Sequence, residues 1–143
     1  TLSNLPASMK ERSHVKVYFA VGIGGIIGSI LRYLVSLLFY PNSFVGFPWA
    51  TLIVNITGAF LLTFILFHPG IKLKLSPSVF TALTTGIVGS YTTFSTITVE
   101  VALLFKVSSF ISISYLFLTI FGGLFCSYLG YKAALRLAGG MIS

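Results

Sequence analysis

Charged residues, and acidic ones above all, are what this 143-residue chain has least of. Only 8% of its residues are charged, and Glu11 and Glu100 are its only acidic side chains. A soluble globular domain carries about 25% charged residues. The chain is instead 56% hydrophobic, and its mean hydropathy is +1.01. A soluble core of this size cannot hide so much apolar surface, so we interpret the chain as an integral membrane protein.

The side chains that most enzymes need are also scarce. The single cysteine, Cys126, excludes an internal disulfide and a cysteine-based zinc cluster. His14 and His68 are the only histidines, and neither belongs to a group with metal-ligand spacing. Glu100 is the only carboxylate inside an apolar stretch, so no acid–base pair can form there. We therefore predict that the protein is not an enzyme.

Four apolar stretches fill the chain, and each is long enough to cross a bilayer as a helix of about 20 residues. They are residues 17–40, 47–67, 78–105 and 110–131, and helix-breaking prolines follow the first and second at residues 40–42 and 68–70. We predict an all-α membrane protein with four transmembrane helices. Its parts are an N-terminal tail (1–16), a transmembrane domain (17–135) and a C-terminal tail (136–143).

The net charge of +7 is distributed unevenly around these stretches. With four spans, seven basic residues fall on one side and one, Lys106, on the other; the seven are Lys10, Arg12, Lys16, Lys72, Lys74, Lys132 and Arg136. Such a bias predicts that both termini are cytoplasmic and that the protein crosses the cell's inner membrane, among its lipids. Because no basic helix face is interleaved with aromatic residues, we predict no nucleic-acid partner.

The third stretch is interrupted by a polar run, Gly-Ser-Tyr-Thr-Thr-Phe-Ser-Thr, at residues 89–96. Residues 90–100 hold six serines or threonines and one tyrosine. Backbone in hydrocarbon must satisfy its own hydrogen bonds, so an unwound run is tolerated where protein or a watery path covers it. Broken helices of this kind often handle ions. We expect the third helix to be broken in mid-membrane, although such hydroxyls also bond back to their own helix.

Three further polar residues lie within the apolar stretches. Asn55 is costly in lipid, so it should either line a pore or make a hydrogen bond between helices, and its position does not decide between the two. Arg32 could extend its charge to the membrane surface or form a salt bridge with Glu100. We keep Arg32 and Glu100 as accessory candidates for function.

Small residues recur four apart in the first and last stretches. Gly24 and Gly28 form one such row, and Gly122, Cys126 and Gly130 form the other. Rows of this kind let helix backbones approach closely in membranes. We predict that both rows are packing surfaces.

Three motifs together resemble those of the Fluc (CrcB-type) fluoride channels. They are GGIIGSILRY at residues 24–33, TLIVNITGAF at 51–60, and the run at 89–96 followed by Glu100. The resemblance covers all four stretches in order. It implies a small four-helix subunit that pairs antiparallel with an inverted subunit and lets fluoride leave the cell passively.

The resemblance also implies specific ion sites. A sodium ion would lie at the dimer centre, held by the main-chain carbonyls of Gly89 and Thr92. The fluoride pathway would include the pore asparagine, the first pore phenylalanine, two hydroxyls beside it and the start of a polar track on the fourth helix. By the motifs these are Asn55, Phe94, Ser95, Thr96, Tyr115 and Thr119.

The chain departs from the family pattern in two ways. Ile97 stands where the family has a second pore phenylalanine. The strong charge bias favours one orientation, whereas a subunit that pairs with its own inverted copy needs nearly balanced charge. We therefore expect a heterodimer with an oppositely oriented paralogue. One alternative is a non-conducting structural half of such a heterodimer. Another is a small multidrug transporter, which is disfavoured because the first helix carries Arg32 and no acid.

Overall fold

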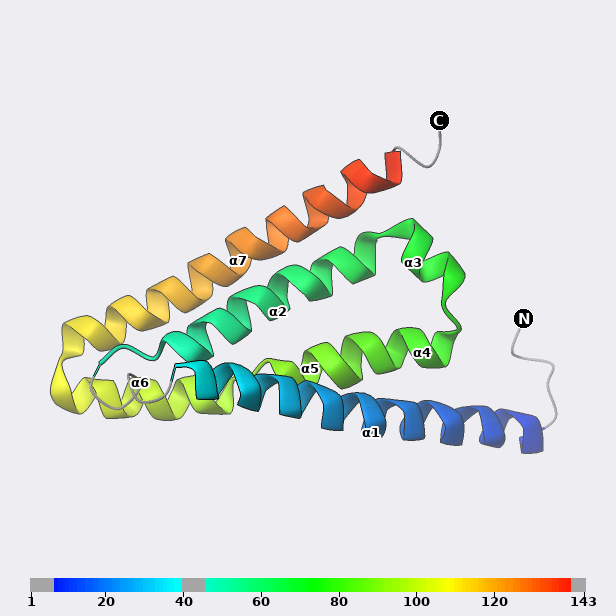
Figure 1. The fold of residues 1–143 in the computed structure, drawn as a ribbon, viewed down its shortest axis with the longest axis horizontal. Helices are drawn as coiled ribbons and strands as arrows, with labels where there is room; N and C mark the ends of the chain where they lie inside the picture. Colours follow the sequence, from blue (N-terminus) through cyan, green and yellow to red (C-terminus); the bar gives the residue numbers. More distant parts are fainter. Residues whose placement is uncertain (1–6, 40–45, 140–143) are drawn as a thin grey trace.

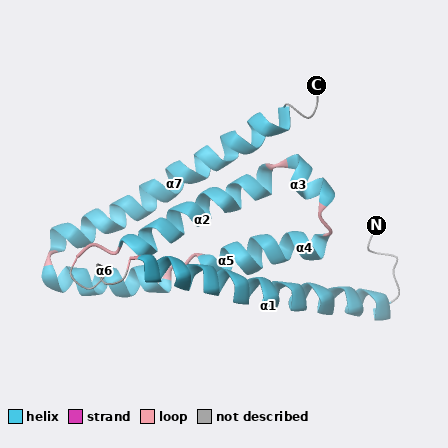
Figure 2. Cartoon of the chain, viewed as in Figure 1, coloured by secondary structure: helices cyan, strands magenta, loops and turns pink. Residues whose placement is uncertain are grey.

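In a computed structural model, the chain folds as a set of long helices (Figure 1). The structure describes residues 7–39 and 46–139, and this part of the chain contains helices and loops but no strand (Figure 2). Four spans are long and apolar enough to cross a membrane: Val15–Leu38, Trp49–Phe67, Pro77–Val107 and Ser109–Gly139. The prediction of an all-α protein with four transmembrane helices is confirmed.

The spans correspond to the following elements. The first lies within α1 (Ala7–Leu38), the second is α2 (Trp49–Phe67) and the last is α7 (Ser109–Gly139). The third span is built from four pieces in succession: α4 (Pro77–Thr81), the π-helix η3 (Ala82–Val88), α5 (Gly89–Tyr91) and α6 (Ser95–Val107). A short helix, α3 (Pro69–Lys74), joins α2 to the third span.

Two helices are longer than the hydropathy pattern predicts. α1 begins at Ala7, inside the predicted tail, and α7 continues to Gly139, beyond the predicted end at residue 131. Hydropathy marks the part of a helix that lies in lipid, whereas lysine, arginine and alanine are good helix formers in water as well. The expected break at residues 40–42 lies outside the described residues.

At the corner between α2 and α4, the two short helices begin with the capping residues and prolines that favour helix starts. His68 ends α2, and its Nδ1 accepts a hydrogen bond from the Ile71 N–H at 3.3 Å as the N-cap of α3. Ser76 is the N-cap of α4, and proline occupies the first turn of both short helices. Proline suits this position because its missing N–H would be unpaired there in any case.

Glycines let the backbones meet at two helix pairs, as the spacing of small residues predicts. α1 packs on η3, where a β-carbon at Gly28 would overlap the Ile87 carbonyl. α2 and α7 run side by side (Figure 1), and there a β-carbon at Gly130 would overlap the Phe60 carbonyl. Both rows are therefore packing surfaces.

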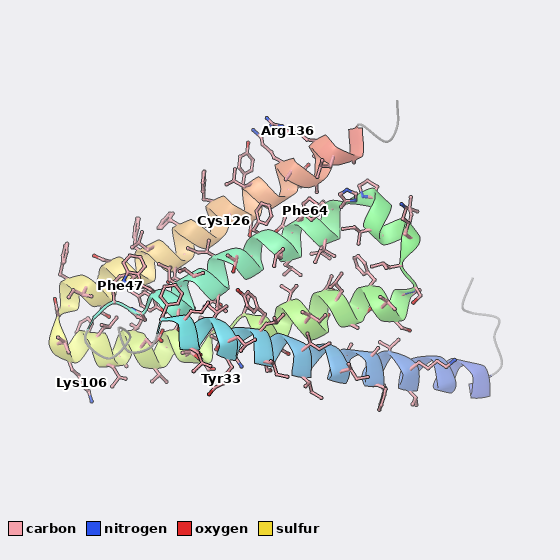
Figure 3. The ribbon with its side chains drawn as sticks, in the orientation of Figure 1. Tyr33, Phe47, Phe64, Lys106, Cys126 and Arg136 are labelled. Carbon is pink, nitrogen blue, oxygen red and sulfur yellow. The ribbon has the colours of Figure 1, made fainter. Side chains whose placement is uncertain are left out.

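The two ends of the bundle differ in charge. The start of α1, the α3 corner and the end of α7 lie at one end, and the α6–α7 turn lies at the other (Figure 1). Arg136 and Lys106 mark these opposite ends in Figure 3. We call the first the basic end; its described basic side chains are Lys16, Lys72, Lys74, Lys132 and Arg136.

Candidate functional site

The third span opens at residues 92–94, between α5 and α6 (Figure 2). Thr92 is extended, with φ −78° and ψ 160°, and Phe94 returns to helical angles as the N-cap of α6. The predicted break is therefore present. Because the break lies within an otherwise apolar span, its backbone N–H and C=O groups need hydrogen-bond partners from the protein.

Asn55 on α2 supplies the main partner of the break. Its Oδ1 accepts a hydrogen bond from the Thr93 N–H at 2.9 Å, and its Nδ2 donates to the Thr51 carbonyl at 2.9 Å. In a continuous helix the Thr93 N–H would bond the Gly89 carbonyl. The Gly89 carbonyl instead lies 3.4 Å from the Thr92 hydroxyl, which bonds the Val88 carbonyl more closely, at 3.2 Å. Asn55 thus makes the hydrogen bond between spans that the sequence left open, and in doing so it frees a carbonyl.

Two further contacts hold α2 against the break. The Thr57 and Tyr91 hydroxyls lie 3.0 Å apart. Thr57 donates to the Ile53 carbonyl at 2.6 Å, so Tyr91 is the donor in the pair. A β-carbon at the buried Gly58 would overlap the Thr92 side chain. The unwound segment is therefore fixed by α2 from both sides of Thr92.

Thr93 organises a cluster of hydroxyls on the α6 side. Its Oγ1 lies 2.9 Å from the Thr96 Oγ1 and 3.3 Å from the Ser95 Oγ, and it accepts a hydrogen bond from the Thr96 N–H. Thr93 is buried, whereas Ser95 is exposed. The sequence analysis did not single out Thr93, although a threonine three residues before Thr96 is a recognisable helix-start signal.

A second polar cluster surrounds Glu100. Its Oε1 accepts from the Thr51 hydroxyl at 2.8 Å, and its Oε2 accepts from the Tyr115 hydroxyl at 2.7 Å. Tyr115 is completely buried, and the Thr119 hydroxyl donates to the Tyr115 carbonyl at 2.8 Å. Glu100 therefore joins α2 and α7 through hydroxyls, and the salt bridge to Arg32 considered from the sequence is not among its contacts. Thr51 is a member that sequence reasoning missed.

A cavity of about 450 Å³ is lined by residues of the break and by one member of the Glu100 cluster. Thr51, on the Glu100 cluster, and Thr93, on the break, both lie in its wall. Arg32 also lines the cavity, and its guanidinium places a positive charge in the wall. The complete wall comprises Ser29, Arg32, Tyr33, Ser36, Ala50, Thr51, Val54, Thr93, Ser95 and Thr96. One positive charge and several hydroxyls suit a small anion.

Phe94 and Ile97 stand at the two positions that the resemblance assigns to pore phenylalanines, and neither residue lines this cavity. The Phe94 side chain is 80% exposed on the outside of the subunit. Ile97 is buried in a core cluster with Leu52 and Tyr115. Within this subunit the Ile97 side chain therefore packs inward, against α2 and α7.

The main-chain carbonyls at the break are the groups with the chemistry to hold a cation. The described residues contain no group of three histidine, cysteine or acidic side chains that could hold a metal ion. Gly89 and Thr92 offer main-chain oxygens instead, because the chain leaves the helix between them. Such oxygens suit a hard cation like sodium.

Comparison with known proteins gives this arrangement a family. Residues 19–131 match the family described as CrcB-like protein, Camphor Resistance (CrcB). The chain belongs to this CrcB-like family. A relative from Desulfitobacterium hafniense (strain Y51), named fluoride-specific ion channel FluC 1, is 43% identical over 110 residues, which cover 76% of this chain and 95% of the relative.

Two other relatives extend the comparison. Fluoride-specific ion channel FluC 2 of Geobacillus kaustophilus (strain HTA426) is 44% identical over 119 residues, or 82% of this chain and 92% of the relative. Fluoride-specific ion channel FluC of Thermosipho melanesiensis (strain DSM 12029 / CIP 104789 / BI429) is 37% identical over 116 residues, or 79% and 91%. The similarity thus spans the transmembrane part of this CrcB-like chain.

Proposed function

We propose that this chain is a subunit of a fluoride-selective ion channel, through which fluoride leaves the cell passively and which so confers resistance to fluoride. The observation that carries the proposal is the opened third span, where the Thr93 N–H is bonded to Asn55 instead of continuing the helix. The names of the relatives support fluoride as the ion.

The chemistry of the cavity suits such an anion. Fluoride is compact and strongly hydrated, and a bare charge does not enter hydrocarbon. The hydroxyls of Ser95 and Thr96 can replace its water in steps, and Arg32 in the same wall attracts negative charge. Outside the cavity, the exposed ring of Phe94 presents a partly positive edge to an anion. The proposed pathway continues on α7 with Tyr115 and Thr119, and the Tyr115 hydroxyl is fixed there by its hydrogen bond to Glu100.

No energy-coupling site is needed for outward movement. An inside-negative membrane potential drives an anion outward by about 2.3 kcal/mol per charge for each 100 mV. A passive pathway therefore suffices to lower the internal fluoride concentration, which is the reason we propose a channel rather than a transporter.

The working unit is an antiparallel pair of subunits. Phe94 is mostly exposed in one subunit, so its ring needs a partner to form a closed path. The carbonyls of Gly89 and Thr92 would hold a sodium ion at the centre of the pair, with the same carbonyls of the inverted subunit completing its shell. This ion would have a structural role. The freeing of the Gly89 carbonyl by Asn55 supports the assignment.

The partner is an inverted paralogue, and this chain inserts with both termini in the cytoplasm. The gathering of basic side chains at one end of the bundle supports a single orientation. Tags on both termini, probed from each side of the membrane, measure it. Finding this chain equally in both orientations would overturn the heterodimer and leave a homodimer.

Fluoride efflux from liposomes tests the function. Asn55→Asp keeps an oxygen for the Thr93 N–H but places a negative charge beside the path, so it should suppress fluoride release. Phe94→Ile removes the ring edge and should do the same. Thr63→Val is the matched control, because the Thr63 hydroxyl bonds only the Ala59 carbonyl of its own helix. Normal flux in both test variants would contradict the assigned path.

A second candidate function is that of a non-conducting half in such a pair. The observation that favours it is Ile97, which is aliphatic and packs into the core with Leu52. Ile97→Phe separates the two: a gain of flux in the pair indicates an idle half, whereas unchanged flux together with loss in Phe94→Ile indicates a conducting one.

A further inference from the structure

The basic end of the bundle carries a second cavity, away from the helix break. It lies at the corner where α2 turns through α3 into α4, and its volume is about 390 Å³. Its wall comprises His68, Gly70, Ile71, Lys74, Leu75 and Leu83. None of these residues lines the cavity at the break, so the corner has a chemistry of its own.

One part of this wall is apolar and the other part is basic. Ile71, Leu75 and Leu83 supply aliphatic surface, while Lys74 supplies an ammonium group. His68 accepts the Ile71 N–H through Nδ1, so the proton of the neutral ring lies on Nε2, where it can be donated. The wall therefore offers donors and positive charge beside a surface that suits hydrocarbon.

The side chains around the cavity are likewise partly basic and partly apolar. Lys72 is exposed next to Lys74, and Leu73 between them is 85% exposed. α3 contacts α7, and the Phe67 ring meets the Tyr131 ring edge-on at 4.9 Å, which brings the basic end of α7 to the same corner. Among side chains that the structure describes, the only acid is Glu100, on α6 beyond the helix break.

We propose that this corner binds the headgroup of an anionic phospholipid in the adjoining leaflet. The phosphate would lie against Lys74, Lys72 and His68, and the acyl chains would lie along Ile71 and Leu83. Basic pockets at the ends of membrane helices bind such headgroups. A free phosphate ion would leave the aliphatic walls in water, so charge and apolar surface together favour a lipid. This site is separate from the proposed ion path.

The single tryptophan of the chain allows a direct test. Trp49 begins α2, at the end of that helix opposite α3, so Trp49→Phe with Leu73→Trp places the only tryptophan at the corner. The full-length chain in vesicles is then quenched by brominated phosphatidylglycerol or by brominated phosphatidylcholine. We expect stronger quenching by phosphatidylglycerol than by phosphatidylcholine. Each lysine should raise the relative affinity of the corner for phosphatidylglycerol by about fivefold.

Variants distinguish a built site from general attraction. Lys72→Gln with Lys74→Gln should abolish the preference, and Leu83→Phe should lower it by narrowing the cavity without changing the charge. Lys106→Gln, at the opposite end, is the control and should change nothing. Equal quenching by both lipids, or a preference that survives the double lysine variant, would overturn the proposal. A preference unaffected by Leu83→Phe would show diffuse attraction and would also overturn it. Fluoride is absent throughout, so the outcome is independent of the channel function.

Discussion

Replacing Asn55 with alanine removes the side chain on which the helix break depends. The Thr93 N–H would lose its acceptor at 2.9 Å in a protein-lined, lipid-embedded position. A buried donor left unpaired costs about 1–3 kcal/mol. If that cost destabilises the unwound conformation at residues 92–94 relative to a continuous helix, the equilibrium population of the unwound conformation drops by about 5- to 150-fold.

Two measurements on Asn55→Ala follow from this estimate. Fluoride efflux from liposomes should fall by a factor in that range, and the melting temperature of the purified protein should fall as well. Thr63→Val removes a polar group from the same helix without touching the break, so it should leave both nearly unchanged. An Asn55→Ala protein that melts and conducts like the wild type would refute the idea that this amide holds the break.

Other substitutions test the remaining parts of the structure. Tyr115→Phe removes one of the two hydroxyl bonds to Glu100 and should cost about 0.5–1.5 kcal/mol in thermal unfolding, with slower fluoride efflux; unchanged melting would argue against the bond. Phe94→Ile should reduce efflux while circular dichroism stays that of the wild type, because the ring is 80% exposed. Gly130→Val forces a side chain onto the Phe60 carbonyl and should destabilise by about 1–3 kcal/mol, visible as loss of folded protein in detergent.

The spans and the break were predictable because each depends on local sequence. Long apolar stretches fix the spans through the thickness of the bilayer. The run from Gly89 to Thr96 combines hydroxyls with a glycine, and it marked the place where the third helix opens. Glycines four apart likewise identified packing surfaces, since close backbone approach requires small residues whatever the partner.

The partners of the polar side chains could not be predicted, because they depend on how each helix is rotated. Glu100 was considered as a partner of Arg32, yet it faces Thr51 and Tyr115. The position of Asn55 allowed a pore or an interhelical bond, and only the register of α2 against the break brings its amide to Thr93. Sequence spacing carries no information on this register.

Fluoride release from sealed vesicles tests most directly whether the opened third span is an ion path. Vesicles loaded with fluoride and containing this chain, together with an inverted paralogue, should empty when a potential is applied, as followed with a fluoride electrode. The same vesicles should retain chloride. Vesicles that hold fluoride as tightly as protein-free ones, with the subunits folded and paired, would contradict the proposed function.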